Sequence, residues 1–206
     1  MKKARLEAFS DGVFAIVITL LILNVKLPET DYEHLAEGLP GMLSSIGVYA
    51  LSFLLIGMYW MFHHHTFSFI AEVDGVILWI NIIFLLFISF LPFPTSMLGK
   101  YPLKELPILV YGINLILLNF MGFLGIVYLR RNKQLSTSLF TDAAFRTQMK
   151  TYFGVNLMYA ACILIAFFSP LVSILLLTVL TLYLIIRSAI FVGIGKCILP
   201  DGRRDK

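Results

Sequence analysis

The sequence predicts an all-α integral membrane protein with six membrane-spanning helices, and two observations support this fold class. The chain has 206 residues, of which 59% are apolar and 14% charged, and its mean hydropathy is +0.90. Soluble domains are about 45–50% apolar and about 25% charged. The apolar residues form long runs, and the basic residues lie in the short segments between them. A formal charge of +4 distributed in this way does not indicate nucleic-acid binding.

The first apolar run is too short to span a bilayer by itself. Residues 12–25 give 14 uncharged positions, whereas a spanning helix needs about 20. Pro28 blocks a forward extension, so we expect the helix at 6–25. Asp11 then lies about one and a half turns inside it, on the order of 8 Å. An ionisable residue at that depth costs a few kcal/mol unless it has a partner or water, so we interpret Asp11 as a functional or assembly site.

Prolines delimit several of the other expected helices. Pro40 opens the second helix near its N-terminus, where proline is tolerated, Pro92 and Pro94 stop the third, and Pro170 ends the fifth. The polar segment 132–150 is the longest connection, and we interpret it as a loop with an interfacial helix. The expected spans, which form one transmembrane domain covering residues 1–206, are 6–25, 40–62, 73–91, 106–129, 151–169 and 171–195.

The distribution of Lys and Arg predicts that both termini are cytoplasmic. Twelve of the 16 basic residues belong to the N-terminus, the fourth connection and the C-terminal tail, and only Lys26, Lys100 and Lys104 belong to the other side. Arg187 is the remaining one, near the inner end of the sixth helix, from where it can snorkel to the interface. We therefore expect a multi-pass protein of the cell membrane.

Motifs of common enzyme and channel classes are absent from the sequence. It contains no Thr-Val-Gly-Tyr-Gly filter, no phosphate-binding loop, no His-Glu-x-x-His and no Gly-x-Ser-x-Gly. Cys162 and Cys197 are too far apart to suggest a zinc site or a disulfide. We expect neither an enzyme nor a resident metal or cofactor. A secondary transporter that uses Asp11 as a proton or cation site remains an alternative to a channel.

Helical geometry divides the first helix into two faces. At 100° per residue, Leu20 and Leu23 lie within about 40° of Ile16, and Thr19 lies about 60° from it. Asp11 falls about 140° away. The helix therefore presents bulky aliphatic side chains on one face and a carboxylate on another. The same periodicity also fits a helix whose aliphatic residues face lipid or other helices, so periodicity alone does not predict a pore.

The residues at the start of this helix carry a family resemblance. Arg5, Phe9, Ser10 and Asp11 form the pattern Arg-x-x-x-Phe-Ser-Asp at the entrance of the first expected span. This arrangement resembles the transmembrane protein 175 family, the lysosomal and prokaryotic potassium channels. The resemblance implies a passive potassium channel of the bacterial single-repeat branch, in the bacterial inner membrane. It also implies a homotetramer whose first helices line one pore, with the motif residues in a hydrogen-bonded structural network on the cytoplasmic side.

The same resemblance implies which residues narrow the pore. The family has aliphatic side chains five, nine and twelve positions after the motif aspartate, which here are Ile16, Leu20 and Leu23. Thr19 matches a family threonine associated with permeation. A ring of aliphatic side chains offers no oxygen to replace the hydration shell of K⁺, so such a constriction acts by its size and by dewetting.

Several aromatic and histidine side chains are candidate partners of the motif residues. Three consecutive histidines point about 100° apart on a helix, so they cannot bind one metal ion together. We expect them in interfaces or hydrogen bonds, including a contact with Asp11 that would make the channel pH-sensitive. The two tryptophans fit either an aromatic belt or packing on the motif network. These candidates are Trp60, His63, His64, His65 and Trp79.

Overall fold

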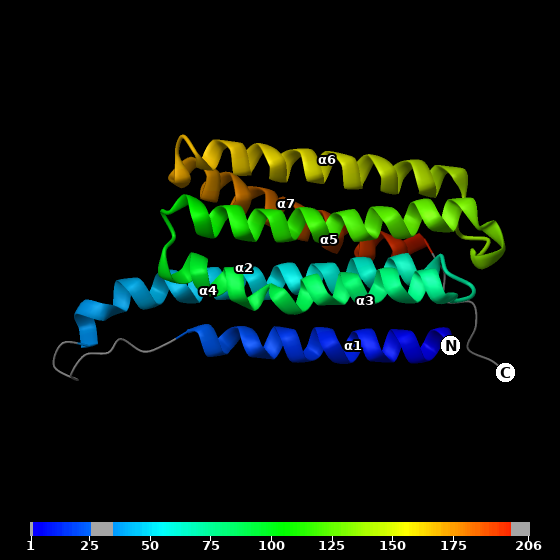
Figure 1. Cartoon of the computed structure of the whole chain (residues 1–206), viewed down its shortest axis with the longest axis horizontal. Coiled ribbons are helices and arrows are strands. Elements are labelled where there is room, and N and C mark those ends of the chain that lie inside the picture. The colour runs from blue at the N-terminus through cyan, green and yellow to red at the C-terminus, as the bar shows by residue number, and fades with distance from the viewer. Residues whose placement is uncertain (1, 26–34, 199–206) are drawn as a thin grey trace.

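The structure, a computed structural model, describes residues 2–25 and 35–198, of which 24, 35–39 and 189–198 are described by their backbone alone. The described chain forms an antiparallel bundle of long helices (Figure 1). In order, the helical elements are α1 (Lys3–Leu20), the 3₁₀ turn η1 (Leu21–Asn24), α2 (Leu35–Ser68), α3 (Gly75–Phe90), α4 (Pro92–Lys100), α5 (Glu105–Arg131), the 3₁₀ turn η3 (Lys133–Leu135), α6 (Asp142–Ala166) and α7 (Pro170–Ile198).

Six helical segments are long and apolar enough to cross a membrane, which confirms the predicted fold class. They are Lys3–Leu23, Pro40–Ser68, Gly75–Lys100, Glu105–Arg131, Asp142–Ala166 and Pro170–Ser188. The first helix begins at Lys3 rather than at residue 6, and the second continues beyond residue 62 to Ser68. All three consecutive histidines are therefore helical.

The third span continues through Pro92, where the sequence predicts a stop. Pro92 is the first residue of α4, a position at which a missing N–H costs nothing. The preceding Leu91 N–H bonds to Ile88 O at 3.1 Å. The Phe87 carbonyl accepts a hydrogen bond from the side chain of Asn114 in α5, with Nδ2 at 3.1 Å. The proline thus divides one span into two helices without ending it.

The fifth span begins nine residues earlier than predicted, at Asp142 rather than at 151. Thr141 caps it, because its side chain accepts a hydrogen bond from Ala144 N at 3.2 Å. The segment expected to form an interfacial helix is therefore partly the first turns of α6. Its polar residues Arg146 and Lys150 are exposed, and exposed charges lower the hydropathy of a segment without interrupting its backbone hydrogen bonds.

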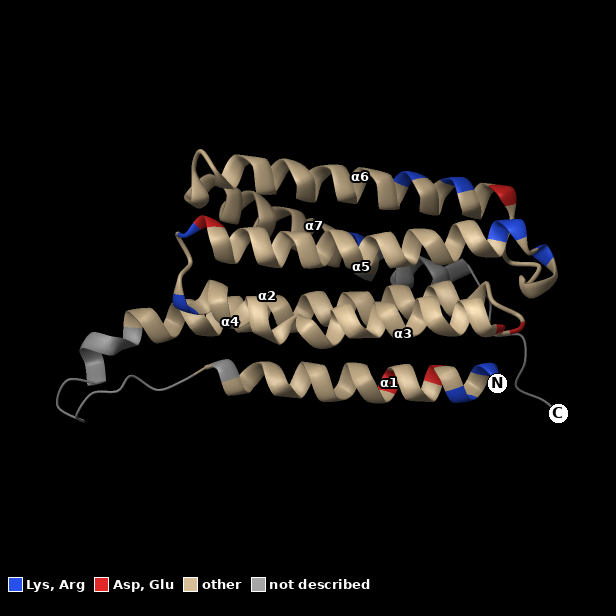
Figure 2. Ribbon diagram, in the orientation of Figure 1, with Lys and Arg blue, Asp and Glu red and all other residues tan. Residues whose placement is uncertain are grey.

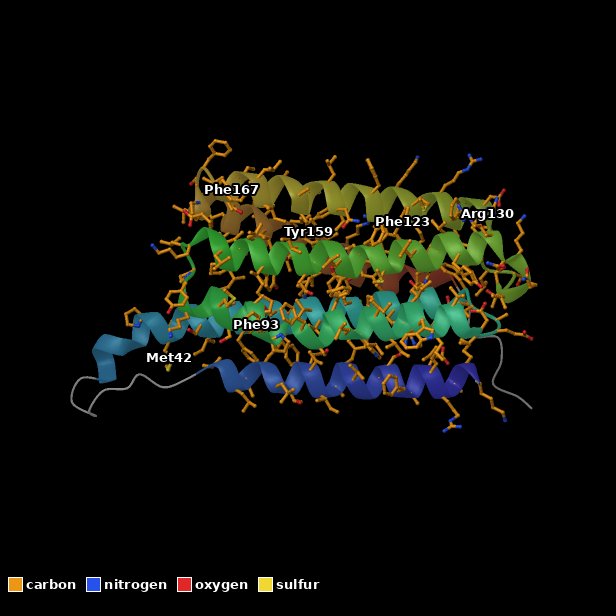
Figure 3. All side chains as sticks on the ribbon, in the orientation of Figure 1. Met42, Phe93, Phe123, Arg130, Tyr159 and Phe167 are labelled. Atoms are coloured by element: carbon orange, nitrogen blue, oxygen red, sulfur yellow. The ribbon has the colours of Figure 1, made fainter. Side chains whose placement is uncertain are left out.

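The helices pack so that α1 lies at one edge of the bundle. Helix α1 contacts α2 and α3, α5 lies between α3 and α6, and α7 packs on α6 and α2 (Figure 1). Helices α5 and α6 approach closely at Gly112 and Gly122, where a Cβ atom would lie 2.7 Å from the side chains of Ile163 and Tyr152. Tyr159 of α6 is fully buried in the interior (Figure 3).

The charged residues gather at the two ends of the bundle (Figure 2). The end that holds the start of α1, the end of α5 and the start of α6 carries most of the basic ones, and we call it the basic end. There the connections after α2 and α5 are joined by hydrogen bonds from Ala71 N to Leu135 O, at 2.7 Å, and from Thr137 N to Phe69 O, at 2.8 Å.

Both the start of α1 and the end of α7 lie at the basic end (Figure 1). Its described basic residues are Lys2, Lys3, Arg5, Arg130, Arg131, Lys133, Arg146 and Lys150. Lys100 and Lys104 lie at the opposite end. The other residues used in the orientation count, Lys26, Arg203, Arg204 and Lys206, lie outside the described residues, and Lys196 is described by its backbone alone. A cytoplasmic basic end remains a prediction from this charge asymmetry.

Candidate functional site at the first helix

One face of α1 is fixed to the bundle. Leu6 and Leu21 have no exposed surface, and Phe14 and Val17 are 2% and 3% exposed. Together with the buried Ser10, these residues recur every three or four positions, which places them on one side of a helix. They pack against α2 and α3, so this face sets how α1 is rotated about its own axis.

Ser10 lies in the middle of the buried face and begins a chain of hydrogen bonds through three helices. Its hydroxyl donates to Leu6 O at 2.9 Å within α1. It accepts from Asn81 Nδ2 of α3 at 3.0 Å. The Asn81 oxygen in turn lies 2.8 Å from His63 Nε2 of α2. Because the amide nitrogen donates to Ser10, the amide oxygen accepts, and His63 carries its proton on Nε2.

His63 is held between aromatic rings. It stacks on Phe67 with 4.2 Å between ring centroids and on Phe84 with 5.6 Å. Phe14 of α1 meets it edge-on, with 5.6 Å between centroids. The imidazole is therefore oriented both by its hydrogen bond and by packing. This arrangement couples α1 to α2 and α3 through contacts of defined direction.

Asp11, the next residue, is bound on the neighbouring face of α1. Its Oδ1 accepts a hydrogen bond from Trp60 Nε1 of α2 at 2.8 Å. The Trp60 ring stacks on His64, with 6.1 Å between centroids and 29° between planes. The hydrogen bond to Asp11 thus comes from a tryptophan and not from one of the three histidines. An indole N–H is a donor only, so it suits an ionised carboxylate.

The remaining residues of the predicted network lie apart from these contacts. Arg5 is exposed, and within the described part of the chain its side chain forms no hydrogen bond or ion pair. Phe9 is 55% and Trp79 64% exposed. His65 meets Phe69 edge-on, away from α1. Asn81, which is not among the predicted network residues, connects Ser10 to His63 by hydrogen bonds. In the sequence it is recognisable as an amide inside an otherwise apolar helix.

The predicted pore residues form an exposed stripe that runs along α1 and into η1. Ile16, Leu20 and Leu23 are 61%, 44% and 68% exposed in the single chain. Thr19 is exposed on the same side, and its hydroxyl donates to Ile16 O at 2.8 Å, which leaves oxygen lone pairs free to accept. The stripe lies opposite to the residues that pack on α2 and α3.

A cavity lies behind this region, between α2, α3, α5 and α6. His63 and Asn81 reach its wall, and so do Tyr59 and Asn119, which are joined by a hydrogen bond of 2.9 Å. Most of the lining is hydrocarbon, so it offers no continuous row of oxygens to an ion. Within residues 2–25 and 35–198, no three His, Cys, Asp or Glu side chains are grouped to hold a metal ion.

Comparisons with known proteins indicate one family. The model of the family described as endosomal/lysosomal potassium channel TMEM175 matches residues 5–92. A potassium channel of Chamaesiphon minutus is 34% identical over an alignment of 198 residues that covers 89% of this chain and 94% of that protein. A potassium channel of Chryseobacterium sp. (strain P1-3) is 42% identical over 118 residues, 57% of this chain and 59% of the relative, so that match spans less than two thirds of either.

The fold has a counterpart among solved structures. The crystal structure of a lysosomal potassium-selective channel TMEM175 homologue from Chamaesiphon minutus superposes with a TM-score of 0.80 at 28% identity. The superposition covers 90% of this chain and 97% of that structure. The similarity therefore extends over most of the chain and well beyond the short motif in α1.

Proposed function

Because this chain belongs to the TMEM175 family, we propose that it is a passive potassium-permeable channel formed by four copies around a shared pore. Potassium conduction is the activity that the names of both bacterial relatives give. A single α1 cannot enclose a pore, so several copies must contribute one each. The protein is a multi-pass membrane protein, and we assign it to the cell membrane of a bacterium with the basic end in the cytoplasm.

The division of α1 into two faces is the observation that carries this proposal. One face is buried against α2 and α3 and is held there by Ser10, whereas the described residues leave Ile16, Leu20 and Leu23 exposed. Helix α1 lies at the edge of the bundle, so the α1 helices of several copies can surround a symmetry axis with their exposed apolar stripes facing it. Helices α6 and α7 then lie on the outer side, toward lipid.

We propose that Ile16, Leu20 and Leu23 stack as three apolar rings along the axis. Their positions differ by three or four residues, about one helical turn. Each ring excludes water when narrow and admits a partly hydrated ion when wide. Thr19 lies beside these rings and contributes hydroxyl oxygens that can replace part of the hydration shell of K⁺.

The four motif residues divide between two tasks in this proposal. Ser10 and Asp11 hold α1 against α2 and α3 through Asn81 and Trp60. Arg5 and Phe9 lie within about 20° of the Ile16 direction and project from the bundle. We assign them to contacts between copies of the chain at the entrance of the pore.

Electrical recording tests this proposal against a secondary transporter that uses Asp11. The purified full chain is reconstituted into a planar bilayer under a potassium gradient. We expect resolvable unitary current steps that reverse near the potassium equilibrium potential. Potassium uptake into vesicles without unitary steps, driven by a proton gradient, would favour the transporter. Native mass in nanodiscs should correspond to four copies, and full activity of a monomer would contradict the shared pore.

A further inference from the structure

Arg187 is a cation on the membrane-spanning part of α7, far from α1. It lies 17 residues after Pro170, the first residue of α7, which corresponds to about 26 Å along the helix. Its side chain is exposed, and it reaches α6, where Nη2 lies 3.2 Å from Thr151 Oγ1. Thr151 is nine residues inside α6. The guanidinium therefore lies within the bundle's length, on the side toward the basic end.

The protein satisfies only a small part of this guanidinium. Thr151 accepts one hydrogen bond from it and donates its own hydroxyl proton to Thr147 O, at 3.0 Å. An arginine has five N–H donors in a planar fork. In the described part of the chain no carboxylate pairs with Arg187. A charged side chain at membrane depth is costly without a partner.

The surroundings of Arg187 are basic. Lys150 lies next to Thr151 on α6, and Arg146 lies one turn nearer the basic end; both are exposed. Asp142, at the start of α6, is the acidic residue of this stretch, and it is already paired with Arg130. Lys150 and Arg146 thus add positive charge on α6 between the level of Thr151 and the basic end.

The surrounding membrane can supply an anion to Arg187. Helix α1 packs on α2 and α3, so the α6–α7 face lies away from the stripe and from any permeating ion. A phospholipid phosphate carries the oxygen geometry that a guanidinium fork binds with two hydrogen bonds. Basic pockets between spanning helices are suited to anionic headgroups. A long arginine side chain can also extend toward the headgroup level.

We propose that Arg187, together with Thr151 and Lys150, binds the phosphate of an anionic phospholipid from the leaflet at the basic end. The guanidinium supplies the directed hydrogen bonds. Thr151 fixes the position of the guanidinium by accepting one of its hydrogens, and Lys150 adds a second positive charge near the headgroup. The site lies outside the pore and stands whether or not the chain conducts potassium.

Lipid selectivity of the reconstituted full chain tests this site. Spin-labelled phosphatidylglycerol and spin-labelled phosphatidylcholine are compared by the fraction that electron paramagnetic resonance reports as immobilised on the protein. We expect wild type to prefer phosphatidylglycerol, and Arg187→Gln to lower that preference about fivefold, the ratio for roughly 1 kcal/mol per basic residue. Lys104→Gln, at the opposite end of the bundle, is the matched control and should leave the preference unchanged.

Two further variants keep the test decisive if Arg187→Gln does not fold. Arg187→Lys keeps the charge without the fork and should retain only part of the preference. Lys150→Gln changes an exposed side chain, and it should lower the preference about twofold. An equal preference for phosphatidylglycerol in wild type and in the folded variants would overturn the proposal. An equal loss in Lys104→Gln would also overturn it, because the effect would then be one of net charge alone.

Discussion

The two halves of the first span, Lys3–Leu23, which consists of α1 and the start of η1, are attached to the bundle by different kinds of contact. In the half nearer the basic end, Ser10 and Asp11 form hydrogen bonds to Asn81 of α3 and Trp60 of α2. Between residues 13 and 23 no described side chain forms a hydrogen bond to another helix, and the attachment consists of apolar packing by residues such as Val17 and Leu21. The predicted constriction lies entirely in this second half.

This difference indicates which part of the first span is free to move. Hydrogen bonds have preferred distances and angles, so they fix both the height and the rotation of the first half. Apolar contacts are non-directional and tolerate small rotations. The second half also ends in the 3₁₀ turn η1, whose hydrogen-bond geometry is poorer than that of an α-helix. We therefore expect the first half to anchor α1 and the second half to widen or narrow the pore.

The largest effect is expected from placing a polar group in the apolar half. Ile16→Asn would put four amides at one level of the proposed pore and let water remain there. We expect the closed-state leak to rise about ten- to a hundredfold, which corresponds to roughly 1.4–2.7 kcal/mol less barrier. Potassium flux from loaded vesicles measures it.

Ile22→Asn is the matched control for this change, because Ile22 is also exposed, at 48%, but lies on another face of the helix. Its leak should equal that of wild type. If both variants destabilise the protein and leave the leak unchanged, Ile16 faces lipid or another helix, and the assignment of the stripe to a pore is wrong.

A smaller effect is expected from removing the hydrogen bonds that link Ser10, Asn81 and His63. Asn81→Leu leaves the His63 Nε2–H without an acceptor and removes the donor to Ser10, so we expect the free energy of unfolding to fall by about 1 kcal/mol. Thermal unfolding in detergent measures the loss. Ser10→Ala should then lower the free energy of unfolding less in the Asn81→Leu background than in wild type. Strictly additive losses would show that the chain of hydrogen bonds does not act as a unit.

Asp11→Asn should have a weaker effect, because an amide oxygen can still accept from Trp60 Nε1. The bond loses its charge assistance, which we expect to cost about 0.5 kcal/mol. We predict altered gating or assembly with an unchanged ratio of K⁺ to Na⁺ permeability, measured from reversal potentials. A normal tetramer with normal gating but altered ion preference would instead place Asp11 at an ion-binding site.

The smallest expected effect is a pH dependence at the start of α3. Burial raises the pKa of the Asp74 carboxyl, but hydrogen bonds from Ile77 N–H and the Tyr128 hydroxyl outweigh it, and the pKa lies below its ordinary value of 3.8. The stabilisation from a lowered pKa is complete above that ordinary value and is lost as the pH falls through the folded-state pKa.

Wild type should therefore lose stability below about pH 4 more steeply than Asp74→Asn, whose side chain does not titrate. Unfolding midpoints in detergent across acidic pH provide the comparison. Parallel curves for the two proteins would show that Asp74 does not contribute to the acid sensitivity of this end of the bundle.

The sequence predicts the number of spans well because hydropathy measures transfer into lipid, and it predicts helix ends less well because they depend on hydrogen bonds. Arg146 and Lys150 lower the hydropathy of the first turns of α6, although their side chains are exposed and the helix passes through them. Thr141 followed by Asp142 is a readable cap signal at the true start. At Pro92 the outcome depends on Asn114, a partner that is distant in the sequence.

The candidate site is likewise only partly predictable from the sequence. Helical periodicity places Ile16, Leu20 and Leu23 on one face of α1 and separates them from Asp11. It cannot select Trp60 over a histidine as the partner of Asp11, because that choice depends on the relative rotation of α1 and α2.

Thiol accessibility tests the central claim, that the free stripe of α1 lines the pore, most directly. In a background without Cys162 and Cys197, single cysteines replace Ile16, Leu20 or Leu23, and Ile18 or Ile22 serves as the control. A small cationic thiol reagent is applied to open channels during recording. We predict that Ile16→Cys, Leu20→Cys and Leu23→Cys lose current, while Ile18→Cys and Ile22→Cys do not. Inert stripe variants with reactive controls would contradict the account, because α1 would then be rotated relative to the pore.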